Sequence, residues 1–291
     1  MAGGRHSLAD MTGRVCVVTG ATRGIGRATA ERLAQLGATL VLVCRRREDG
    51  DRVAGAFAQL PAPRAEVVVA DLASQQAIRE AAEAIRARHP RVHVLVNNAG
   101  LIPRTREVTV DGLEMQLAVN HLAPFLLTNL LLDRLAAGAP ARVVNVSSGT
   151  HQGGTIDFAD LQSERRYDPV RVYGRTKLAN VLFTYALARR ARPLGVTANC
   201  LHPGVIATKL LADYMNVPAR SGGPAIGDSP EQGSEAIVYL AASPEIEGVT
   251  GRYFVGRRED RSWPASYDEG LQERLWEESA RLVALADAAT P

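Results

Sequence analysis

A tyrosine and a lysine stand four positions apart in the segment Tyr173-Gly174-Arg175-Thr176-Lys177. In a helix, this spacing puts both side chains on one face. A phenol with a reference pKa of about 10 is mostly protonated at neutral pH, and lowering that pKa to about 7 requires roughly 4 kcal/mol of preference for the phenolate. A neighbouring ammonium group favours the phenolate in a partly dehydrated cleft. The pair could therefore transfer a proton, although the same spacing is common on exposed polar helix faces.

Polar turns follow three of the strands that the sequence predicts. A serine, Ser148, ends one strand, the segment Asn97-Asn98-Ala99-Gly100 ends another, and His202-Pro203-Gly204 follows a third. Open α/β sheets bind their ligands at the carboxyl ends of the strands. We therefore expect these groups to gather at one edge of a sheet, which favours a catalytic role for the tyrosine and lysine.

A glycine-rich turn, GATRGIG from Gly20 to Gly26, follows the first predicted strand directly and precedes a helical pattern. In such a turn one glycine makes the tight bend, another lets the backbone approach a pyrophosphate, and a third allows close helix-strand packing. The N-terminus of the helix then faces the anion. A glycine cluster alone is a weak signal, but its place between the first strand and the first helix predicts a dinucleotide ligand.

The end of the second predicted strand bears on which dinucleotide binds. An acidic side chain there would bind a ribose 2′-hydroxyl, whereas an arginine would accept a 2′-phosphate. The strand is followed by Arg45, Arg46 and Arg47, with no carboxylate before Glu48. Arg23 in the glycine turn could approach the same phosphate and add a second guanidinium. The sequence thus predicts NADP(H) over NAD(H), the alternative being that these arginines form only a solvated run of charge.

The elements that must position these groups alternate along the chain. Short, mostly β-branched apolar runs predict strands at residues 15–19, 39–44, 65–70, 92–97, 141–147, 196–201 and 252–255. Helical patterns lie between them, at about 24–37, 48–59, 74–89, 111–137, 171–192 and 230–242. Near-continuous apolar strands are typical of a parallel sheet buried on both faces. The pattern predicts an α/β fold, a doubly wound parallel sheet of about seven strands with helices on both faces.

We expect residues 1–291 to form a single domain with a core at about 13–256. Segment 209–232 is rich in glycine and proline, which predicts a long loop that could border the substrate. Ser266 to Glu269 matches a capping box and opens a helical pattern with leucines on one side. This C-terminal helical extension, about 266–289, is expected to pack onto the sheet domain or onto a subunit partner.

Composition excludes several other classes of protein. The 34 Lys and Arg nearly balance the 31 Asp and Glu, which argues against a dedicated nucleic-acid binder. The three cysteines are far apart and lie in β-like runs, so we expect buried thiols in a reducing compartment and no metal site. The first ten residues lack the apolar region of a signal peptide, and the sequence contains no apolar run of about 18 residues. We therefore expect a cytoplasmic protein without a membrane span.

With these motifs the sequence resembles the short-chain dehydrogenase/reductase family, from Gly13 to Val255. The shared pattern consists of TGATRGIG, NNAG, an asparagine-bearing helix, a serine before YGRTK, and HPG. The resemblance implies a Rossmann fold and an NADP-dependent enzyme that acts on CH-OH donors, interconverting a carbonyl and an alcohol by hydride transfer. It also implies pairing through the helices at 111–137 and 171–192, as a homodimer or homotetramer.

The resemblance assigns roles to individual residues. Tyr173 is the general acid/base, Lys177 lowers its pKa, Ser148 orients the substrate oxygen, and Asn120 supports a water-linked proton relay. The motifs above and the resemblance together give the cofactor residues Gly20, Thr22, Arg23, Gly24, Ile25, Gly26, Arg45, Arg46, Asp71, Leu72, Asn98, Ala99, Gly100, Tyr173, Lys177, Pro203, Gly204, Val205 and Thr208. Pro124 stands four positions after Asn120 and has no N–H, so we expect a kinked helix whose freed Asn120 carbonyl holds the relay water.

The substrate is less closely defined. The 24 residues between Ser148 and Tyr173 are more than most of the family has there, and with KLANVLFT they resemble the retinol dehydrogenase and protochlorophyllide reductase branch. That resemblance implies an apolar substrate of medium to large size. A soluble ketone, aldehyde or secondary alcohol, a β-ketoacyl or polyketide-type substrate, and a non-catalytic NADP(H)-binding sensor remain alternatives. His151, beside this insertion, is expected to be an exposed loop residue.

Overall fold

The computed structural model describes residues 8–60, 65–206 and 227–285. Its strands form one sheet in the order β3-β2-β1-β4-β5-β6-β7-β8. Their bounds are β1 Val15–Thr19, β2 Thr39–Cys44, β3 Glu66–Val69, β4 Val94–Asn97, β5 Ala141–Val146, β6 Val196–His202, β7 Tyr253–Val255 and β8 Arg258–Asp260. β1 to β7 pair in parallel, and β8 pairs antiparallel to β7. The expected doubly wound parallel sheet is confirmed, with β8 in addition to the seven strands anticipated.

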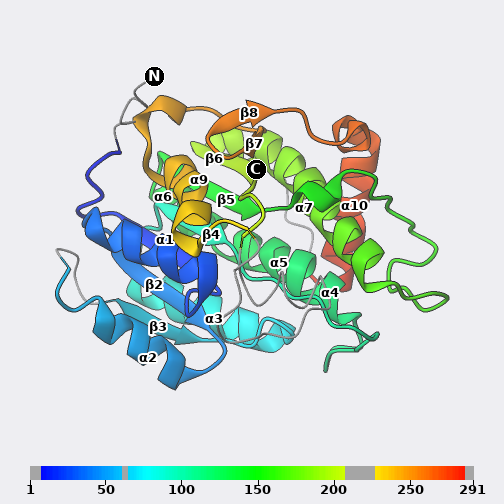
Figure 1. Ribbon diagram of the computed structural model, residues 1–291, viewed down its shortest axis with the longest axis horizontal. Helices are drawn as coiled ribbons and strands as arrows, with labels where there is room; N and C mark the ends of the chain where they lie inside the picture. Colours follow the sequence, from blue (N-terminus) through cyan, green and yellow to red (C-terminus); the bar gives the residue numbers. More distant parts are fainter. Residues whose placement is uncertain (1–7, 61–64, 207–226, 286–291) are drawn as a thin grey trace.

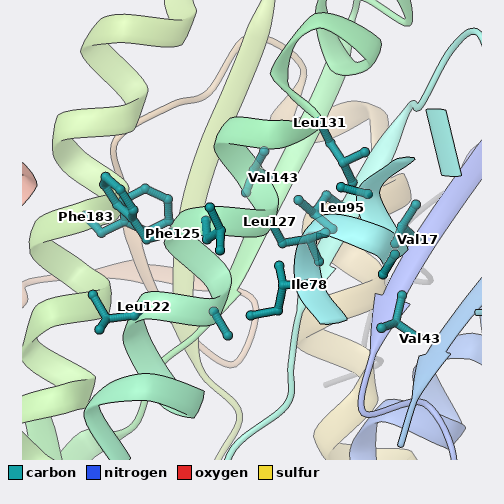
Figure 2. Close-up of a cluster of buried hydrophobic side chains, with 14 of the residues drawn as sticks. Val17, Val43, Ile78, Leu95, Leu122, Phe125, Leu127, Leu131, Val143 and Phe183 are labelled. Carbon is teal, nitrogen blue, oxygen red and sulfur yellow. The ribbon is translucent and has the colours of Figure 1, made fainter. Parts of the chain in front are cut away.

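Helices cover both faces of this sheet (Figure 1). Their bounds are α1 Gly24–Gln35, α2 Arg47–Ala56, α3 Gln75–Arg88, α4 Met115–Leu117, α5 Ala123–Leu130, α6 Leu132–Ala137, α7 Pro169–Ala191, α9 Pro230–Ala242 and α10 Glu269–Leu282. Alternate residues of β1 belong to different cores. Val17 joins a cluster with Ile78 of α3 and Phe125 of α5 (Figure 2), whereas Val18 joins a cluster with Leu33 of α1 and residues of α9. Both faces of the parallel strands are buried, so their apolar runs are continuous.

The strand order reverses between β1 and β4, whose register pairs Val17 with Leu95. The loops that leave the carboxyl ends of these two strands run in opposite directions, and open α/β sheets bind ligands in the crevice between such loops. The glycine-rich turn leaves β1 at this point, and Asn98 follows β4. The topology therefore sets the position of the site.

The helical region expected at 111–137 is not one helix. α4 leads into a π-helix, Ala118–Leu122, and α5 follows with Pro124 in its first turn. Since proline has no N–H, the regular bonding pattern cannot continue through this position, and one residue is looped out into the wider π turn. Pro124 thus interrupts the regular α-helical hydrogen bonding, as its missing N–H predicts.

The C-terminal extension differs in its start from the expected capping box. Asp268 caps α10, its carboxylate accepting a bond from the Leu271 N–H at 3.0 Å, while Ser266 lies in a 3₁₀ turn, Pro264–Tyr267. α10 lies beside α7 (Figure 1). Part of the predicted loop at 209–232, together with Thr208, lies outside the described residues, and α9 begins at Pro230 within its remainder. Within the described ranges, no helix combines the length and apolarity needed to cross a membrane.

Candidate active site

The glycine-rich turn after β1 has the geometry of a cradle for an anion. Gly20 and Gly24 have φ values of +65° and +53°, which favour glycine. A Cβ on Gly26 would lie 2.4 Å from the carbonyl oxygen of Gly20, so that position admits only glycine. The first turn of α1 carries no acidic residue, and no side chain caps it. Its N–H groups are thus available to a pyrophosphate, and the residues present fit a dinucleotide.

Asn98 joins the glycine turn to the end of β4. Its side-chain amide donates to the carbonyl oxygen of Thr19 at 2.9 Å, and the Thr19 hydroxyl accepts bonds from the N–H groups of Asn98 and Ala99 at 3.0 and 3.1 Å. A Cβ on Gly100 would lie 3.4 Å from Asn120 Oδ1 and 3.6 Å from Lys177 Nζ. The Asn98–Gly100 segment therefore links the cofactor cradle to the residues expected to be catalytic.

The three arginines among the expected cofactor residues, Arg23, Arg45 and Arg46, differ in their surroundings. Arg46 forms an ion pair with Asp49, with Nη2 2.5 Å and Nε 2.6 Å from the carboxylate. Arg23 and Arg45 are exposed, and neither has an ion-pair partner in the part of the chain that the structure describes. Asp71, at the end of β3, is exposed and accepts a bond from the Ala73 N–H at 3.0 Å. Arg23 and Arg45 are thus better available to a phosphate than Arg46.

Tyr173 and Lys177 lie in the first turns of α7. Asp168 caps this helix by accepting bonds from the N–H groups of Val170 and Arg171, both at 3.0 Å. Lys177 is buried, and its Nζ lies 5.4 Å from the centroid of the Tyr173 ring. The ammonium donates to the carbonyl oxygen of Val146 at 3.0 Å. Burial lowers the pKa of Lys177 to about 8, so the ammonium is charged at neutral pH.

Ser148 stands at the carboxyl end of β5, directly before the 3₁₀ turn Gly149–His151, which packs against α7. Its hydroxyl oxygen accepts a bond from the Thr150 N–H at 3.3 Å, which leaves its own proton to donate. The preceding residue, Ser147, donates to the carbonyl oxygen of Lys177 at 2.9 Å and so fixes β5 against α7. His151, expected to be exposed, is fully buried against the ring of Tyr253, with ring centroids 4.7 Å apart. That expectation is wrong because a distant segment covers the loop.

Asn120 lies in the π-helix and is fully buried. Its side chain accepts a bond from the Leu101 N–H at 2.8 Å, and its amide donates to the Leu101 carbonyl oxygen at 2.9 Å. The same amide lies 3.2 Å from Thr176 Oγ1, and that hydroxyl donates to the Tyr173 carbonyl oxygen at 2.8 Å. The Asn120 side chain thus ties the segment after Gly100 to the turn of α7 that carries Tyr173.

The main-chain carbonyl of Asn120 accepts a bond from the Asn180 side-chain amide at 2.8 Å. This differs from the expectation that the carbonyl freed by Pro124 would hold a water, since a side chain of α7 takes that place. Neither Asn180 nor Thr176 is among the site residues predicted from the sequence. The sequence signal for them is their position in the helix. Asn180 stands three residues after Lys177 and so shares its helical face, and Thr176 directly precedes Lys177.

The remaining expected residues lie around this site. Thr22, Arg23, Gly24 and Ile25 form the turn into α1, and Leu72 packs against the core near α3. Pro203 and Gly204 follow β6, and Val205 is 53% exposed. Thr208 lies outside the described residues. Over the described ranges, no three His, Cys, Asp or Glu side chains gather as metal ligands, and the cysteines are buried free thiols.

Known proteins with similar sequences or structures match this chain over most of its length. Mouse (Mus musculus) retinol dehydrogenase 13 is 44% identical over 291 residues, covering 97% of this chain and 87% of that protein. The crystal structure of an uncharacterised protein from Mycobacterium paratuberculosis has a TM-score of 0.79 and 32% identity, covering 96% of each chain. A structure named as an NAD(P)-dependent gluconate 5-dehydrogenase from Beutenbergia cavernae, with bound NADP, has a TM-score of 0.65 and 33% identity, covering 84% of this chain and 96% of that one.

The family model described as short chain dehydrogenase matches residues 14–217, which include the glycine turn, Asn120, Ser148 and the tyrosine-lysine pair. This match spans the carboxyl-edge site as well as the strands that build it. The relative from mouse extends the similarity over nearly the whole chain. The chain belongs to the short-chain dehydrogenase family of oxidoreductases, and it is similar to retinol dehydrogenases.

Proposed function

We propose that this protein is an NADP(H)-dependent oxidoreductase that interconverts a ketone or aldehyde and an alcohol, with Tyr173 as general acid/base. The observation that carries the proposal is the buried pair on α7, with the Lys177 ammonium 5.4 Å from the ring of Tyr173. Ser148 follows β5 and begins a turn that packs against α7, and Asn120 approaches Gly100 from the π-helix. Binding of a dinucleotide alone would not require a buried ammonium beside a buried phenol.

In the proposed reaction a bound nicotinamide supplies or accepts the hydride. During reduction, the Tyr173 hydroxyl gives its proton to the substrate oxygen, and during oxidation the phenolate takes it back. The Ser148 hydroxyl donates a hydrogen bond to the same oxygen and orients it. The Lys177 ammonium stabilises the phenolate form of Tyr173 through its positive charge. Asn120 keeps the Gly100–Leu101 segment and the Tyr173 turn of α7 at a fixed separation.

NADP(H) is proposed over NAD(H) because two exposed guanidinium groups, those of Arg23 and Arg45, follow β1 and β2 at the carboxyl edge. A 2′-phosphate bears two negative charges at neutral pH and can accept paired hydrogen bonds from two guanidinium groups. The relative from Beutenbergia cavernae, whose structure holds NADP, supports this preference by similarity.

The proposed substrate is apolar and of medium to large size, as the similarity to retinol dehydrogenases suggests. The main alternative is a β-ketoacyl or polyketide-type carbonyl. A panel of aldehydes and ketones of graded length and polarity separates the two, because an apolar site gains affinity with each buried CH₂.

The experiment that tests the function measures NADPH and NADH consumption over this panel for the wild type and for Tyr173→Phe. The phenylalanine keeps the ring and lacks the proton, so we expect kcat to fall on the order of 10²- to 10⁴-fold. Cofactor binding, followed by fluorescence, should remain. Unchanged turnover in Tyr173→Phe would refute the assignment, and binding of NADPH without turnover of any carbonyl would favour the sensor.

A further inference from the structure

Two buried histidines connect the site to the C-terminal segment, by which we mean residues 261–282, the 3₁₀ turn and α10 included. His151 lies three residues after Ser148, and His121 directly follows Asn120. Their exposed fractions are 0% and 1%. The proposed mechanism uses neither ring. Each ring nevertheless bonds on one side toward a proposed catalytic residue and on the other side to the C-terminal segment.

The His151 ring bridges Ser148 and Trp263. Its Nδ1 lies 2.7 Å from the carbonyl oxygen of Ser148, which can only accept, so Nδ1 carries a proton. Its Nε2 lies 3.1 Å from the main-chain N–H of Trp263, which can only donate, so Nε2 is bare. The ring is therefore neutral, with its proton on Nδ1. Protonation of Nε2 would bring two N–H groups face to face and break the bridge.

The His121 ring belongs to a chain of bonds that ends on Asn120. Because the Asn120 carbonyl can only accept, the amide nitrogen of Asn180 faces it, and Asn180 Oδ1 faces His121 Nδ1 at 3.4 Å. Oδ1 can only accept, so Nδ1 carries the proton here too. Ser279 Oγ of α10 then donates to the bare Nε2 at 2.8 Å. Every donor in the chain points from α10 toward Asn120.

Packing holds both rings in these orientations. Tyr253 lies against His151, with centroids 4.7 Å apart, and Phe125 and Phe183 flank His121 at 6.4 and 6.3 Å. Burial lowers the pKa of both histidines, in the case of His121 to about 4, which keeps the rings neutral at pH 7. The rings behave as fixed spacers with one donor and one acceptor each.

We propose that the C-terminal segment positions both Ser148 and Asn120, through the neutral rings of His151 and His121. This inference rests on the proposed function, since it makes the two histidines positioning residues for that chemistry. The C-terminal segment thereby sets the geometry of a site to which it contributes no reacting group. A shift of the order of 1 Å in such a group costs on the order of 100-fold in rate.

A first test reads the protonation of the rings and needs no activity. In the ¹⁵N-histidine-labelled full chain at pH 7, NMR distinguishes the protonated from the bare ring nitrogen. His121→Gln and His151→Gln identify the two sets of resonances. We expect both rings to carry the proton on Nδ1. A proton on Nε2 of either ring would overturn the bridge assigned to it.

A second test removes one N–H from the Ser148 bridge. Trp263 has a φ of −56°, which proline adopts, so Trp263→Pro deletes the donor with the backbone angle retained. Trp263→Ala is the matched control, because it removes the same indole and keeps the N–H. We expect kcat of the proline variant to lie on the order of 10- to 100-fold below that of the alanine variant, with the same KM for NADPH. Equal kcat values would contradict the proposal.

A third test acts on the Asn120 bridge from α10. Ser279→Ala removes the donor to His121, whereas Glu273→Gln weakens α10 at its ion pairs with Arg189 and Arg190, away from the histidine. We expect Ser279→Ala to lower kcat on the order of 10-fold or more, and Glu273→Gln to lower Tm while kcat stays unchanged. If kcat instead follows Tm in both variants, the effect is one of stability and the inference fails.

The outcomes separate this inference from the function on which it rests. If the wild type reduces no carbonyl, the proposed function fails, while the NMR result still decides the ring assignments. If the wild type turns over and Tyr173→Phe does not, but Trp263→Pro and Ser279→Ala match their controls, the function stands and the positioning role falls.

Discussion

The Asn180 side chain donates to the main-chain carbonyl of Asn120 across 2.8 Å, inside the protein. Pro124 deprives this carbonyl of its usual N–H partner, so Asn180 satisfies an acceptor that would otherwise be buried and unpaired. Asn180→Leu keeps the volume and removes the donor. We expect the free energy of unfolding to fall by about 1–3 kcal/mol, the usual cost of such a group.

Urea denaturation measures this change, and Asn129→Leu is a suitable control. Asn129 is half-buried and donates to the carbonyl oxygen of Phe125 at 2.8 Å, where water can replace it. The control should lose less stability than Asn180→Leu. Equal losses in the two variants would show that Asn120 is satisfied in another way.

Lys177 carries a buried charge that favours the proposed chemistry and costs stability. Burial lowers its pKa from 10.5 to about 8, a difference of about 2.5 units, which corresponds to about 3 kcal/mol at pH 7. Lys177→Met removes the charge and keeps most of the side chain. We expect this variant to be inactive and yet more stable than the wild type at pH 7, by up to about 3 kcal/mol. The loss of the hydrogen bond from Lys177 to the Val146 carbonyl oxygen reduces this gain.

The stability difference between Lys177→Met and the wild type depends on pH because burial lowers the pKa of Lys177. Below pH 8 the lysine is charged in both states, and the folded state bears the full burial cost. As pH rises from 8 toward 10.5, the folded protein loses the proton before the unfolded chain does, so the wild type gains stability relative to Lys177→Met. Unfolding curves for both proteins between pH 7 and 10 should converge. A constant gap would rule out the buried ammonium as its cause.

Arg45 and Arg46 should differ in their effects on cofactor preference. Arg46 is held by Asp49, whereas Arg45 has no ion-pair partner within the described ranges. We expect Arg45→Ala to lower kcat/KM for NADPH on the order of 10-fold, as for a lost charge-assisted bond, with little change for NADH. Arg46→Ala, the matched control, should change the NADPH to NADH ratio less. A larger effect of Arg46→Ala, or an equal loss with both cofactors, contradicts this assignment.

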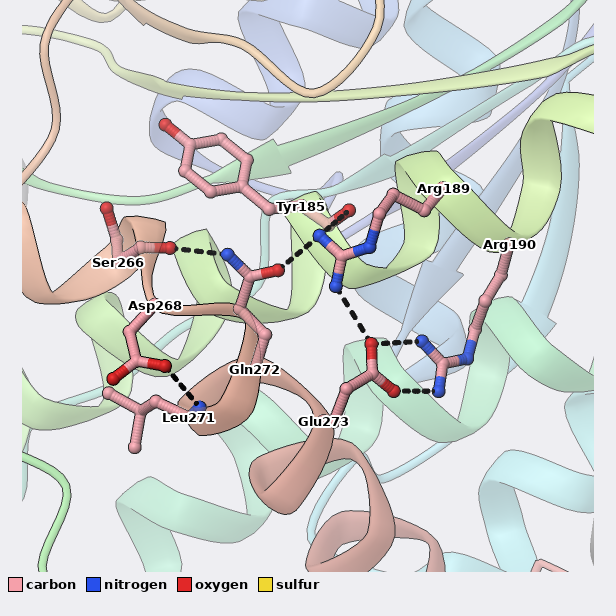
Figure 3. A network of polar contacts seen from close by, with 8 residues as sticks. All are labelled: Tyr185, Arg189, Arg190, Ser266, Asp268, Leu271, Gln272 and Glu273. Carbon is pink, nitrogen blue, oxygen red and sulfur yellow. Dashed lines mark hydrogen bonds and ion pairs between the residues drawn. The ribbon is translucent and has the colours of Figure 1, made fainter.

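Glu273 fastens α10 to α7 through the guanidinium groups of Arg190 and Arg189 (Figure 3). The bonds from Arg190 and then those from Arg189 lower the pKa of Glu273 to about 2. A carboxyl with a lowered pKa contributes stability above its unfolded value, 4.5 here, and loses it as pH falls toward 2. Glu273→Gln should therefore melt below the wild type at pH 7 by a modest margin, since the side chain is 40% exposed.

Thermal unfolding at pH 7, 4.5 and 3 follows that loss. The melting temperatures of Glu273→Gln and the wild type should approach each other as the pH falls. Glu277→Gln, at an exposed position of the same helix, controls for the general effect of removing a charge. An equal drop in Tm for both variants would show that the ion pairs add nothing specific.

Local signals were sufficient for most of the fold and for selecting the residues that we propose as catalytic. Strands such as 15–19 carry continuous apolar runs because both faces are buried, and the glycine turn is marked by angles that other residues avoid. β8 was missed because Arg258, Glu259 and Asp260 are all charged and exposed, and pairing with β7 alone makes them a strand.

The rest of the site depends on contacts between distant parts of the chain. His151 is buried because Trp263, 112 positions later, bonds to its ring. His121 bonds to Ser279, 158 positions later, and the sequence pattern near either residue does not predict this contact. The start of α10 at Asp268 rather than Ser266 likewise follows from contacts, since the Ser266 hydroxyl donates to the Trp263 carbonyl oxygen. Sequence patterns indicate local conformation, whereas hydrogen bonds between distant segments depend on the packing of the whole chain.

The position of α10 also bears on assembly. Trp276 packs its ring against Phe125 of α5 and Phe183 of α7, with centroids 4.9 and 5.8 Å apart, and the Arg190 guanidinium covers it at 4.3 Å. The family resemblance suggested that two copies would pair through this pair of helices. Here the chain itself covers part of that surface. A second copy that docked on these helices would have to displace α10 or pack around it. An assembly through other faces of the protein would leave α10 in place.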